Sequence, residues 1–337
     1  LYTATALHTL MKRYLPNSQA ADRDIGKGFD LIVGTSTGGI LAAALALGKP
    51  IPKIIELYSS YGRQIFPDPT PSSKQLWWAF KNRKKPSGKS EVLLERLEDI
   101  FGNETILSLY QKRGISLCIP AVNLATNRAW VFKTPHNPAK HRDDNYKLSE
   151  VCMATSAAPI FLPLALLKNP DNQIGMDVFA DGGLWANSPV LVGLVEAIEM
   201  SNGRPIEIVS IGTCPPPSGQ VVTAENANRG VLDWLAGIKI VESSIDAQAS
   251  GHQYIANLLS KTLSNLGRKC TLVRLPQTPP SSEQCCHLGL DSASDQAVSI
   301  LSQLGKSDGE IAHSWSMADS DAERLCLKNI FSSLPSF

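Results

Sequence analysis

A serine set between glycines is the part of this chain best suited to chemistry. Ser36 lies within Gly34-Thr35-Ser36-Thr37-Gly38-Gly39, which follows an apolar run and precedes a stretch of small apolar residues. A G-x-S-x-G pattern between a strand and a helix makes a sharp turn that holds the serine hydroxyl clear of the backbone. The helix N-terminus then offers N–H groups to a developing oxyanion. We therefore expect Ser36 to be a nucleophile and Gly34, Thr37, Gly38 and Gly39 to form its turn and oxyanion side.

A nucleophilic serine needs a base, and the sequence offers two kinds. Three histidines lie downstream, in the order that α/β-hydrolases use: His252, His287 and His313. The other candidate is Asp181, which follows a short apolar run and precedes Gly182 and Gly183. Asp-Gly-Gly is also an ordinary turn sequence. In an open α/β sheet, however, Ser36 and Asp181 would both emerge at the carboxyl ends of strands, where sites form.

Three segments, taken together, resemble the patatin-like phospholipases. They are residues 34–39, Ala154-Thr155-Ser156-Ala157-Ala158-Pro159 and Asp181-Gly182-Gly183-Leu184-Trp185-Ala186-Asn187-Ser188-Pro189. They occur in the family's order, and the resemblance extends to about Leu304. It implies a Ser–Asp dyad without histidine, with Ser36 as nucleophile, Asp181 as general base, and Gly182 and Gly183 supporting the base. The family usually has Asn-Asn-Pro where this chain has Asn187-Ser188-Pro189.

The same resemblance implies a serine acyl hydrolase of phospholipase A or lysophospholipase type that needs no cofactor. Two alternatives stay open: an α/β-hydrolase esterase with a Ser-His-Asp triad, and a non-catalytic ligand-binding protein on the same fold. The family also has a glycine-rich loop before its first helix, which donates amides to the oxyanion. Because Leu1-Tyr2-Thr3-Ala4 looks like the residues just after that loop, we expect the loop to precede residue 1. Losing one such donor costs about 2.7–4 kcal/mol.

Apolar patterning predicts helices that alternate with strands. The expected helices cover residues 1–14, 40–47, 52–61, 91–101, 147–154, 189–200 and most of 231–266, and two more close the chain. The expected strands cover residues 29–33, 115–122, 129–133, 178–180, 206–211 and 270–275. This alternation predicts a three-layer α/β/α sandwich with a mostly parallel sheet, similar to patatins and lysophospholipases. We expect one domain over residues 1–337, since the Pro-rich stretch 215–218 is the only tempting internal boundary.

The composition is that of an ordinary globular protein, with 43% hydrophobic residues and a net charge of +1. It gives no reason to expect a nucleic-acid partner. The longest apolar run, Ile40–Leu47, is too short to span a bilayer. Seven irregularly spaced cysteines indicate reduced thiols and a cytoplasmic protein. Cys285-Cys286-His287 has no second ligand pair at a useful spacing, so we expect no metal site.

One segment combines three aromatic side chains with four cations: Trp77, Trp78, Phe80, Lys81, Arg83, Lys84 and Lys85. Aromatics at headgroup depth with cations on anionic lipid would make a transient membrane contact, and the same segment could form a lid. The alternative is a short helix that tucks its aromatics into the core, followed by a solvated basic loop. Both interpretations stay open.

Some bacterial members of the resembled family are anti-phage effectors that a cyclic nucleotide switches on. The resemblance therefore extends to a cyclic-nucleotide activator in antiviral defence, and an always-active lipase is equally compatible with it. Four basic residues are candidates for phosphate binding but form no nucleotide motif: Arg63, Lys74, Arg113 and Arg128. A homo-oligomer is left open, and the expected location is cytoplasmic and peripheral to the membrane during action.

Overall fold

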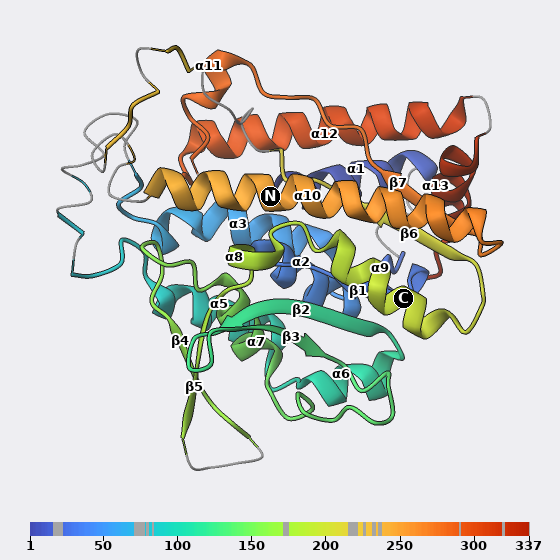
Figure 1. Ribbon diagram of the computed structural model, residues 1–337, viewed down its shortest axis with the longest axis horizontal. Helices are drawn as coiled ribbons and strands as arrows, with labels where there is room; N and C mark the ends of the chain where they lie inside the picture. Colours follow the sequence, from blue (N-terminus) through green and yellow to red (C-terminus); the bar gives the residue numbers. More distant parts are fainter. Residues whose placement is uncertain are drawn as a thin grey trace.

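The structure is a computed structural model. It describes residues 1–15, 23–70, 78, 81–82, 84–170, 175–214, 222–224, 227–230, 234, 238–289, 291–318 and 321–336. Within these residues, helices cover both sides of a mixed β-sheet (Figure 1). This confirms the predicted α/β sandwich.

The helices of the described residues come in the following order: α1 (Tyr2–Tyr14), η2 (Gly26–Gly28), α2 (Thr37–Ala46), α3 (Ile51–Ile65), α5 (Ser90–Phe101), α6 (Ile106–Arg113), α7 (Leu148–Ser156), α8 (Gly183–Ala186), α9 (Val190–Ser201), α10 (Ile238–Asn265), α11 (Ser282–Cys285), α12 (Asp295–Met317) and α13 (Ala322–Ser332). The strands are β1 (Leu31–Val33), β2 (Ser116–Asn123), β3 (Arg128–Lys133), β4 (Ala165–Lys168), β5 (Met176–Asp181), β6 (Ile206–Ser210) and β7 (Cys270–Arg274).

The larger sheet has the order β1-β2-β5-β4, and β3 also pairs with β2. Only β1 and β2 are parallel in it; the pairs β2–β3, β2–β5 and β4–β5 are antiparallel. The prediction of a mostly parallel sheet is therefore wrong. Strands β2 and β3 are antiparallel because a short turn, with Asn127 at φ 53°, joins them as a hairpin. A second sheet holds β6 and β7, which are parallel.

Helix α2 lies at the centre of the core, directly after the nucleophile turn. Its residues from Gly39 to Ala46 are all buried, and it contacts β1, β2, α3 and α7. A helix that is apolar on all sides is stable only when neighbours cover all of it. The small side chains of this helix let those neighbours approach closely, and the enclosed helix provides a firm base for Ser36.

Most predicted elements are present within a few residues of their expected bounds. The elements that were not predicted are short: η2, α6, α8, α11 and β4. Helix α2 begins at Thr37 rather than at Ile40, because the glycines that look like loop residues form its first turn. Segment 66–90 was expected to be irregular, and part of it lies outside the described residues.

Candidate active site

The turn between β1 and α2 places Ser36 in an unusual backbone conformation. Its φ is 55° and its ψ is −129°, a region that residues other than glycine rarely adopt and that costs about 1–3 kcal/mol. Two bonds hold this turn from outside. The Thr35 hydroxyl donates to the Ala186 carbonyl over 2.7 Å, and the Ser36 amide donates to Oγ1 of Thr155 over 2.9 Å. The strain therefore lies at the residue predicted to be the nucleophile.

The glycines of this turn differ in whether a larger side chain would fit at their positions. A Cβ on Gly34 would lie 2.1 Å from the carbonyl oxygen of Gly38, so only glycine fits there. A Cβ on Gly39 would lie 2.8 Å from Cγ2 of Thr155. Gly38, by contrast, has no atom within 4 Å of such a position among the described residues. The space beside Gly38 is thus an open approach to Ser36.

Asp181 lies at the carboxyl end of β5 and contacts the serine directly. The Ser36 hydroxyl donates to Oδ2 of Asp181 over 2.6 Å, and the Gly183 amide donates to Oδ1 over 2.6 Å. A Cβ on Gly182 would lie 2.2 Å from the Pro120 carbonyl oxygen, so glycine lets the turn after Asp181 pack against β2. The structure therefore brings Ser36, Asp181, Gly182 and Gly183 together as the sequence predicts.

Burial tunes the Asp181 carboxyl toward the strength of a useful base. The residue is only 6% exposed, and desolvation raises its pKa from 3.8 to about 6 against the opposing bonds from Ser36 and Gly183. A general base works best when its pKa lies near the operating pH. At neutral pH this carboxylate is ionised and much more basic than an exposed aspartate.

Thr155 joins the two halves of the site. Its hydroxyl accepts a hydrogen bond from the Ser36 amide and donates one to the Pro120 carbonyl over 2.6 Å. Its own carbonyl accepts the Gly182 amide over 3.2 Å, and the neighbouring Ala157 carbonyl accepts the Asp181 amide over 2.9 Å. In the sequence, this segment is recognisable only as part of a family motif. The hydrogen bonds by which Thr155 connects the Ser36 turn to the Asp181 turn depend on the three-dimensional fold.

Comparison with known proteins agrees with this geometry. The family described as "Patatin-like phospholipase" matches residues 1–194, which is more than half of the chain. This chain belongs to the patatin-like phospholipase family. It is accordingly a lipid acyl hydrolase, an enzyme that cleaves carboxylic esters of lipids.

Three bacterial relatives carry the same description, "cGAMP-activated phospholipase". The protein from Vibrio cholerae is 32% identical over 295 residues, which cover 84% of this chain and 79% of the relative. The one from Escherichia coli is 33% identical and covers 85% of this chain and 78% of the relative. The one from Pseudomonas aeruginosa is 35% identical, with 75% and 73% covered.

The three downstream histidines lie away from the Ser36–Asp181 pair or contact only its surroundings. His252 lies on α10, and its Nδ1 is 3.1 Å from the carbonyl oxygen of Ser188. The ring of His313 stands edge-on to Tyr14. The Ser292 hydroxyl donates to the backbone carbonyl of His287. Among the described residues, Ser36 has a side-chain hydrogen bond to Asp181 and to no histidine.

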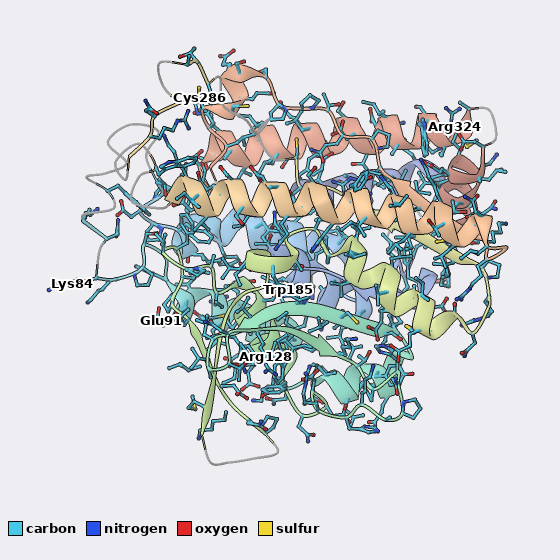
Figure 2. The ribbon with its side chains drawn as sticks, viewed as in Figure 1. Lys84, Glu91, Arg128, Trp185, Cys286 and Arg324 are labelled. Carbon is cyan, nitrogen blue, oxygen red and sulfur yellow. The ribbon has the colours of Figure 1, made fainter. Side chains whose placement is uncertain are left out.

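Helix α10 crosses the molecule and covers the segment that follows Asp181 (Figure 1). Gln248 on α10 donates to the Leu184 carbonyl over 3.4 Å, and its Oε1 lies 3.5 Å from the Asn187 amide. Trp185, at the middle of the view in Figure 2, donates from Nε1 to the Ala121 carbonyl over 2.8 Å. The segment after Asp181 is thus held on one side by β2 and on the other by α10.

The amides at the start of α2 differ in availability. The Gly38 amide donates to the Thr35 carbonyl over 2.8 Å and the Gly39 amide to the Ser36 carbonyl over 2.8 Å. For the Thr37 amide, the described residues provide no such turn bond. The amide directly after the nucleophile is also the usual oxyanion donor in such a turn. Of the Thr37, Gly38 and Gly39 amides, that of Thr37 is therefore the best placed to donate to an oxyanion.

In the aromatic and basic segment 77–85, one residue fits the core interpretation, and the exposed lysines remain compatible with a membrane contact or a lid. Trp78 is only 2% exposed, packs near Phe161 and donates from Nε1 to the Asp68 carbonyl over 3.2 Å. A buried tryptophan does not insert into headgroups, so the core alternative holds for Trp78. Lys81, which pairs with Asp68 over 2.8 Å, is exposed. Lys84 and Lys85 are exposed too, and Lys84 extends from one end of the molecule (Figure 2). Three members lie outside the described residues: Trp77, Phe80 and Arg83.

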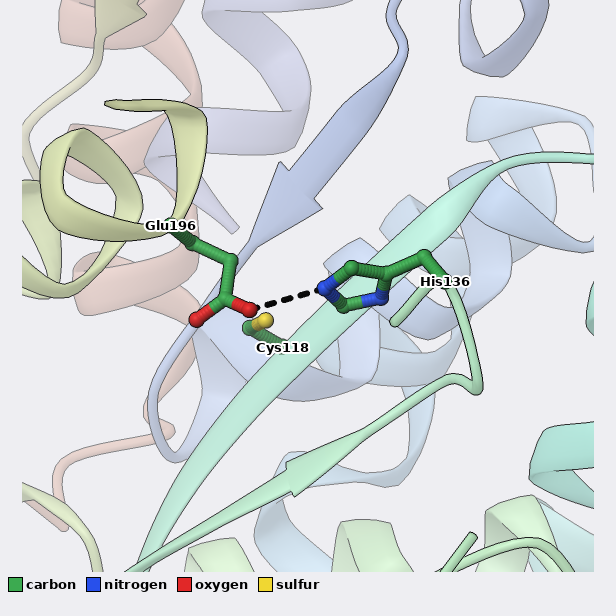
Figure 3. A group of neighbouring side chains, drawn as sticks. All are labelled: Cys118, His136 and Glu196. Atoms are coloured by element: carbon green, nitrogen blue, oxygen red, sulfur yellow. Dashed lines mark hydrogen bonds and ion pairs between the residues drawn. The ribbon is translucent and has the colours of Figure 1, made fainter. Parts of the chain in front are cut away.

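A second polar cluster, which the sequence analysis missed, lies between β2 and α9 (Figure 3). Ligand-type atoms of Cys118, His136 and Glu196 lie within 4.8 Å of one another. Nε2 of His136 is 2.8 Å from Oε1 of Glu196, its Nδ1 is 2.9 Å from the Thr134 hydroxyl, and the Lys133 ammonium pairs with Glu196. Burial would raise the pKa of Glu196, but His136 and Lys133 lower it to about 2. Because these groups satisfy one another, we interpret the cluster as an ion-pair network that fastens α9 to the sheet.

No helix among the described residues is both long enough and apolar enough to cross a bilayer. The seven cysteines are free thiols. Cys285 and Cys286 make weak sulfur contacts to the carbonyls of Pro280 and Ser282.

Proposed function

We propose that this enzyme hydrolyses phospholipid esters through a Ser36–Asp181 dyad. The observation that carries the proposal is the 2.6 Å hydrogen bond from the Ser36 hydroxyl to Oδ2 of Asp181. A serine hydroxyl becomes nucleophilic when a neighbouring base accepts its proton, and the position of the Asp181 carboxylate beside the Ser36 hydroxyl supports that role. An esterase with a histidine base is the weaker alternative, because among the described residues the Ser36 side chain bonds to Asp181 and to no histidine.

In the first half of the reaction, Ser36 attacks the ester carbonyl while its proton passes to Oδ2 of Asp181. The tetrahedral intermediate then collapses, and the protonated Asp181 gives this proton to the departing lysophospholipid or glycerophosphoryl alcohol. In the second half, Asp181 accepts a proton from water, and the resulting hydroxide attacks the acyl-enzyme ester. The second tetrahedral intermediate then collapses, the fatty acid leaves, and the protonated Asp181 returns its proton to Oγ of Ser36, which restores the free hydroxyl and the carboxylate. Each step requires the pKa of Asp181 to lie close to the working pH.

The oxyanion forms on the open side of the turn, next to Gly38. We propose the Thr37 amide as one donor, because it begins α2 and the helix dipole favours negative charge there.

Activation by a cyclic dinucleotide is the regulatory part of the proposal. It rests on the three relatives named as cGAMP-activated phospholipases, each at least 32% identical and each covering 75% or more of this chain. Two basic residues predicted for phosphate binding are engaged in ion pairs, Arg63 with Asp295 and Arg113 with Asp24. Arg128 is exposed at the start of β3 (Figure 2), and Lys74 lies outside the described residues. We propose that the activated enzyme acts in the cytoplasm on the membrane surface, in antiviral defence.

The test measures fatty-acid release from phosphatidylcholine–phosphatidylglycerol vesicles with and without 3′,3′-cGAMP. The other cyclic dinucleotides and Ser36→Ala serve as controls. We expect release that cGAMP increases and that Ser36→Ala abolishes. Release at the same rate with every nucleotide would reject activation while keeping the hydrolase. If a fluorophosphonate probe failed to label Ser36 in any of these conditions, the dyad would be rejected in favour of a non-catalytic binding protein.

A further inference from the structure

An exposed apolar surface lies near Asp181, on the outer face of the hairpin that β4 and β5 form at one edge of the molecule (Figure 1). Side chains of β4 alternate, so that Leu166 and Lys168 are exposed while the other two residues of the strand are buried. Leu164, two positions before Leu166, is also exposed, and Met176 lies directly opposite Lys168 on the paired strand. Leu164, Leu166 and Met176 are 43%, 59% and 47% exposed, so a row of large apolar side chains is open to solvent.

Ile160 adds to this surface and has a strained backbone. Its φ is 78°, a region in which a β-branched residue is an outlier, yet the residue is 45% exposed rather than packed into the core. Two backbone hydrogen bonds hold this segment, from the Ser87 amide to the Ile160 carbonyl over 3.2 Å and from the Gly88 amide to the Phe161 carbonyl over 2.7 Å. Strain that persists at an exposed apolar residue points to a use for that residue outside the core.

The apolar surface begins beside the residues that hold Asp181. The Ala157 carbonyl accepts the Asp181 amide over 2.9 Å, and Ile160 follows only three residues later. Strand β5 ends at Asp181, and the antiparallel register brings the start of β4, next to Leu164, to that end of β5. Ile160 and Leu164 therefore lie at the end of the apolar surface that is closer to the Ser36–Asp181 pair.

Exposed lysines flank the apolar residues. Three come from the segment that bonds to the Ile160 and Phe161 carbonyls, and the fourth shares a face of β4 with Leu166: Lys84, Lys85, Lys89 and Lys168. Residues 81–90 contain five cationic residues and no acidic one, so this fringe is positively charged. Lys84 and β4 lie toward the same end of the molecule (Figures 1 and 2).

We propose that this surface docks the enzyme on an anionic phospholipid bilayer. Its apolar side chains enter the boundary between headgroups and acyl chains, and its four lysines contact the anionic headgroups. Because Ile160 and Leu164 lie at the end closer to the dyad, docking brings the bilayer close to Ser36 and Asp181. The inference rests on the proposed function, since it concerns how the hydrolase reaches its lipid.

A second copy of this chain is the rival occupant of the surface. Two copies related by a twofold axis would present the same surface to each other, so the four lysines of one copy would face those of the other. Like charges brought together disfavour such an interface. The anionic headgroups of a bilayer attract the same lysines, and charge therefore favours the bilayer.

Vesicle sedimentation of matched double variants tests the proposal. Leu166→Thr with Met176→Thr removes apolar surface and keeps a residue type common in strands. Leu258→Thr with Met317→Thr is the control, because these residues, on α10 and α12, are also one leucine and one methionine and are each 52% exposed. Both double variants carry Ser36→Ala, so phosphatidylcholine–phosphatidylglycerol vesicles stay intact and binding is measured without turnover. We expect the first pair to weaken binding by about tenfold and the control pair to leave it unchanged.

Equal vesicle binding by the first pair and its Ser36→Ala parent would overturn the proposal, and so would an equal loss in both pairs. A parent that light scattering shows to be a dimer, with the first pair monomeric and still bound to vesicles, would assign the surface to a second copy. With Ser36 restored, the first pair should hydrolyse a soluble short-chain ester at the parent rate and vesicles more slowly. A failure of the proposed dyad removes both activities and leaves the difference in binding.

Hydrogen exchange of the Ser36→Ala chain decides the question if the first pair fails to fold. Peptides that cover residues 159–168 should exchange more slowly when phosphatidylcholine–phosphatidylglycerol vesicles are added, while peptides from α12 should keep their rates. Unchanged exchange at residues 159–168 would overturn the proposal.

Discussion

The Ser36 hydroxyl donates a 2.6 Å hydrogen bond to Oδ2 of Asp181, although 145 positions separate the two residues in the chain. Ser36 follows β1, Asp181 is the last residue of β5, and glycines come shortly after each. The two strands are not neighbours, since β2 lies between β1 and β5. The contact forms because β2 pairs with both strands and because Thr155 holds both turns.

The pH dependence of turnover should reflect Asp181. Because its pKa is raised to about 6, the ionised base is lost as the pH falls through that value. We expect kcat/KM on a soluble short-chain ester to be flat near pH 7.5 and to fall about tenfold per pH unit below about 6. A rate that stays flat down to pH 4.5 would show that Asp181 has an ordinary pKa or is not the base.

Replacing the buried carboxylate should also stabilise the protein at neutral pH. A pKa raised from 3.8 to about 6 disfavours the ionised folded state by about 3 kcal/mol. Between pH 3.8 and about pH 6 the folded state binds more protons than the unfolded chain. The cost of burying the ionised carboxylate is therefore absent at low pH and complete above about pH 6. We expect Asp181→Asn to raise the free energy of unfolding at pH 7 by about 1–3 kcal/mol.

Urea denaturation of Asp181→Asn and the parent chain at pH 7 and at pH 4 measures this effect. The difference between the two proteins should shrink as the pH falls, and comparing the pair at each pH cancels the titration of other groups. An equal difference at both pH values would contradict the raised pKa.

Thr155 should act as a positioning residue for the nucleophile. Thr155→Val leaves the Ser36 amide and the Pro120 carbonyl without their partner, which should lower the free energy of unfolding by about 1–3 kcal/mol. It should also lower kcat more than it raises KM, because the elbow loses its anchor. Thr155→Ser keeps the hydroxyl and should restore most of kcat. If the two variants behaved alike, the hydroxyl would have no positioning role.

The exposed lysines after Trp78 should contribute to membrane contact. A lysine near an anionic surface is worth about 1 kcal/mol, so Lys84→Glu with Lys85→Glu should weaken binding to phosphatidylglycerol vesicles by about tenfold or more. Lys306 is an exposed lysine on α12, so Lys306→Glu serves as a control for a charge reversal away from this segment. Vesicle sedimentation at low and at high salt is the measurement. Equal binding by all three proteins would place the membrane contact on another surface.

The local part of the site could be predicted from the sequence, and the non-local part could not. The strand-turn-helix pattern identifies Ser36, because glycines on both sides of a serine after an apolar run have few other uses. Asp181 could be chosen over the histidines only through the resemblance to patatins, since Asp-Gly-Gly alone is an ordinary turn. The mixed sheet was not predictable in this way, because apolar runs carry no information on strand direction.

Packing explains the remaining differences. Tryptophan is a residue type typical of membrane interfaces, yet the contacts of Trp78 with Asp68 and Phe161 place it in the core. Thr155 and the Cys118–His136–Glu196 cluster depend on residues that are distant in the chain, so no spacing signals them.

The most direct test of the dyad compares two single substitutions in the phospholipid hydrolysis assay. Asp181→Asn removes the base while keeping the shape of the side chain, and His252→Ala removes the histidine that bonds to the segment after Asp181. We predict that Asp181→Asn lowers kcat by about 10⁴-fold while its circular dichroism spectrum stays that of the parent chain. His252→Ala should keep kcat within about threefold, because a group outside the reacting unit contributes little. Loss of turnover with His252→Ala and its retention with Asp181→Asn would contradict the Ser–Asp mechanism.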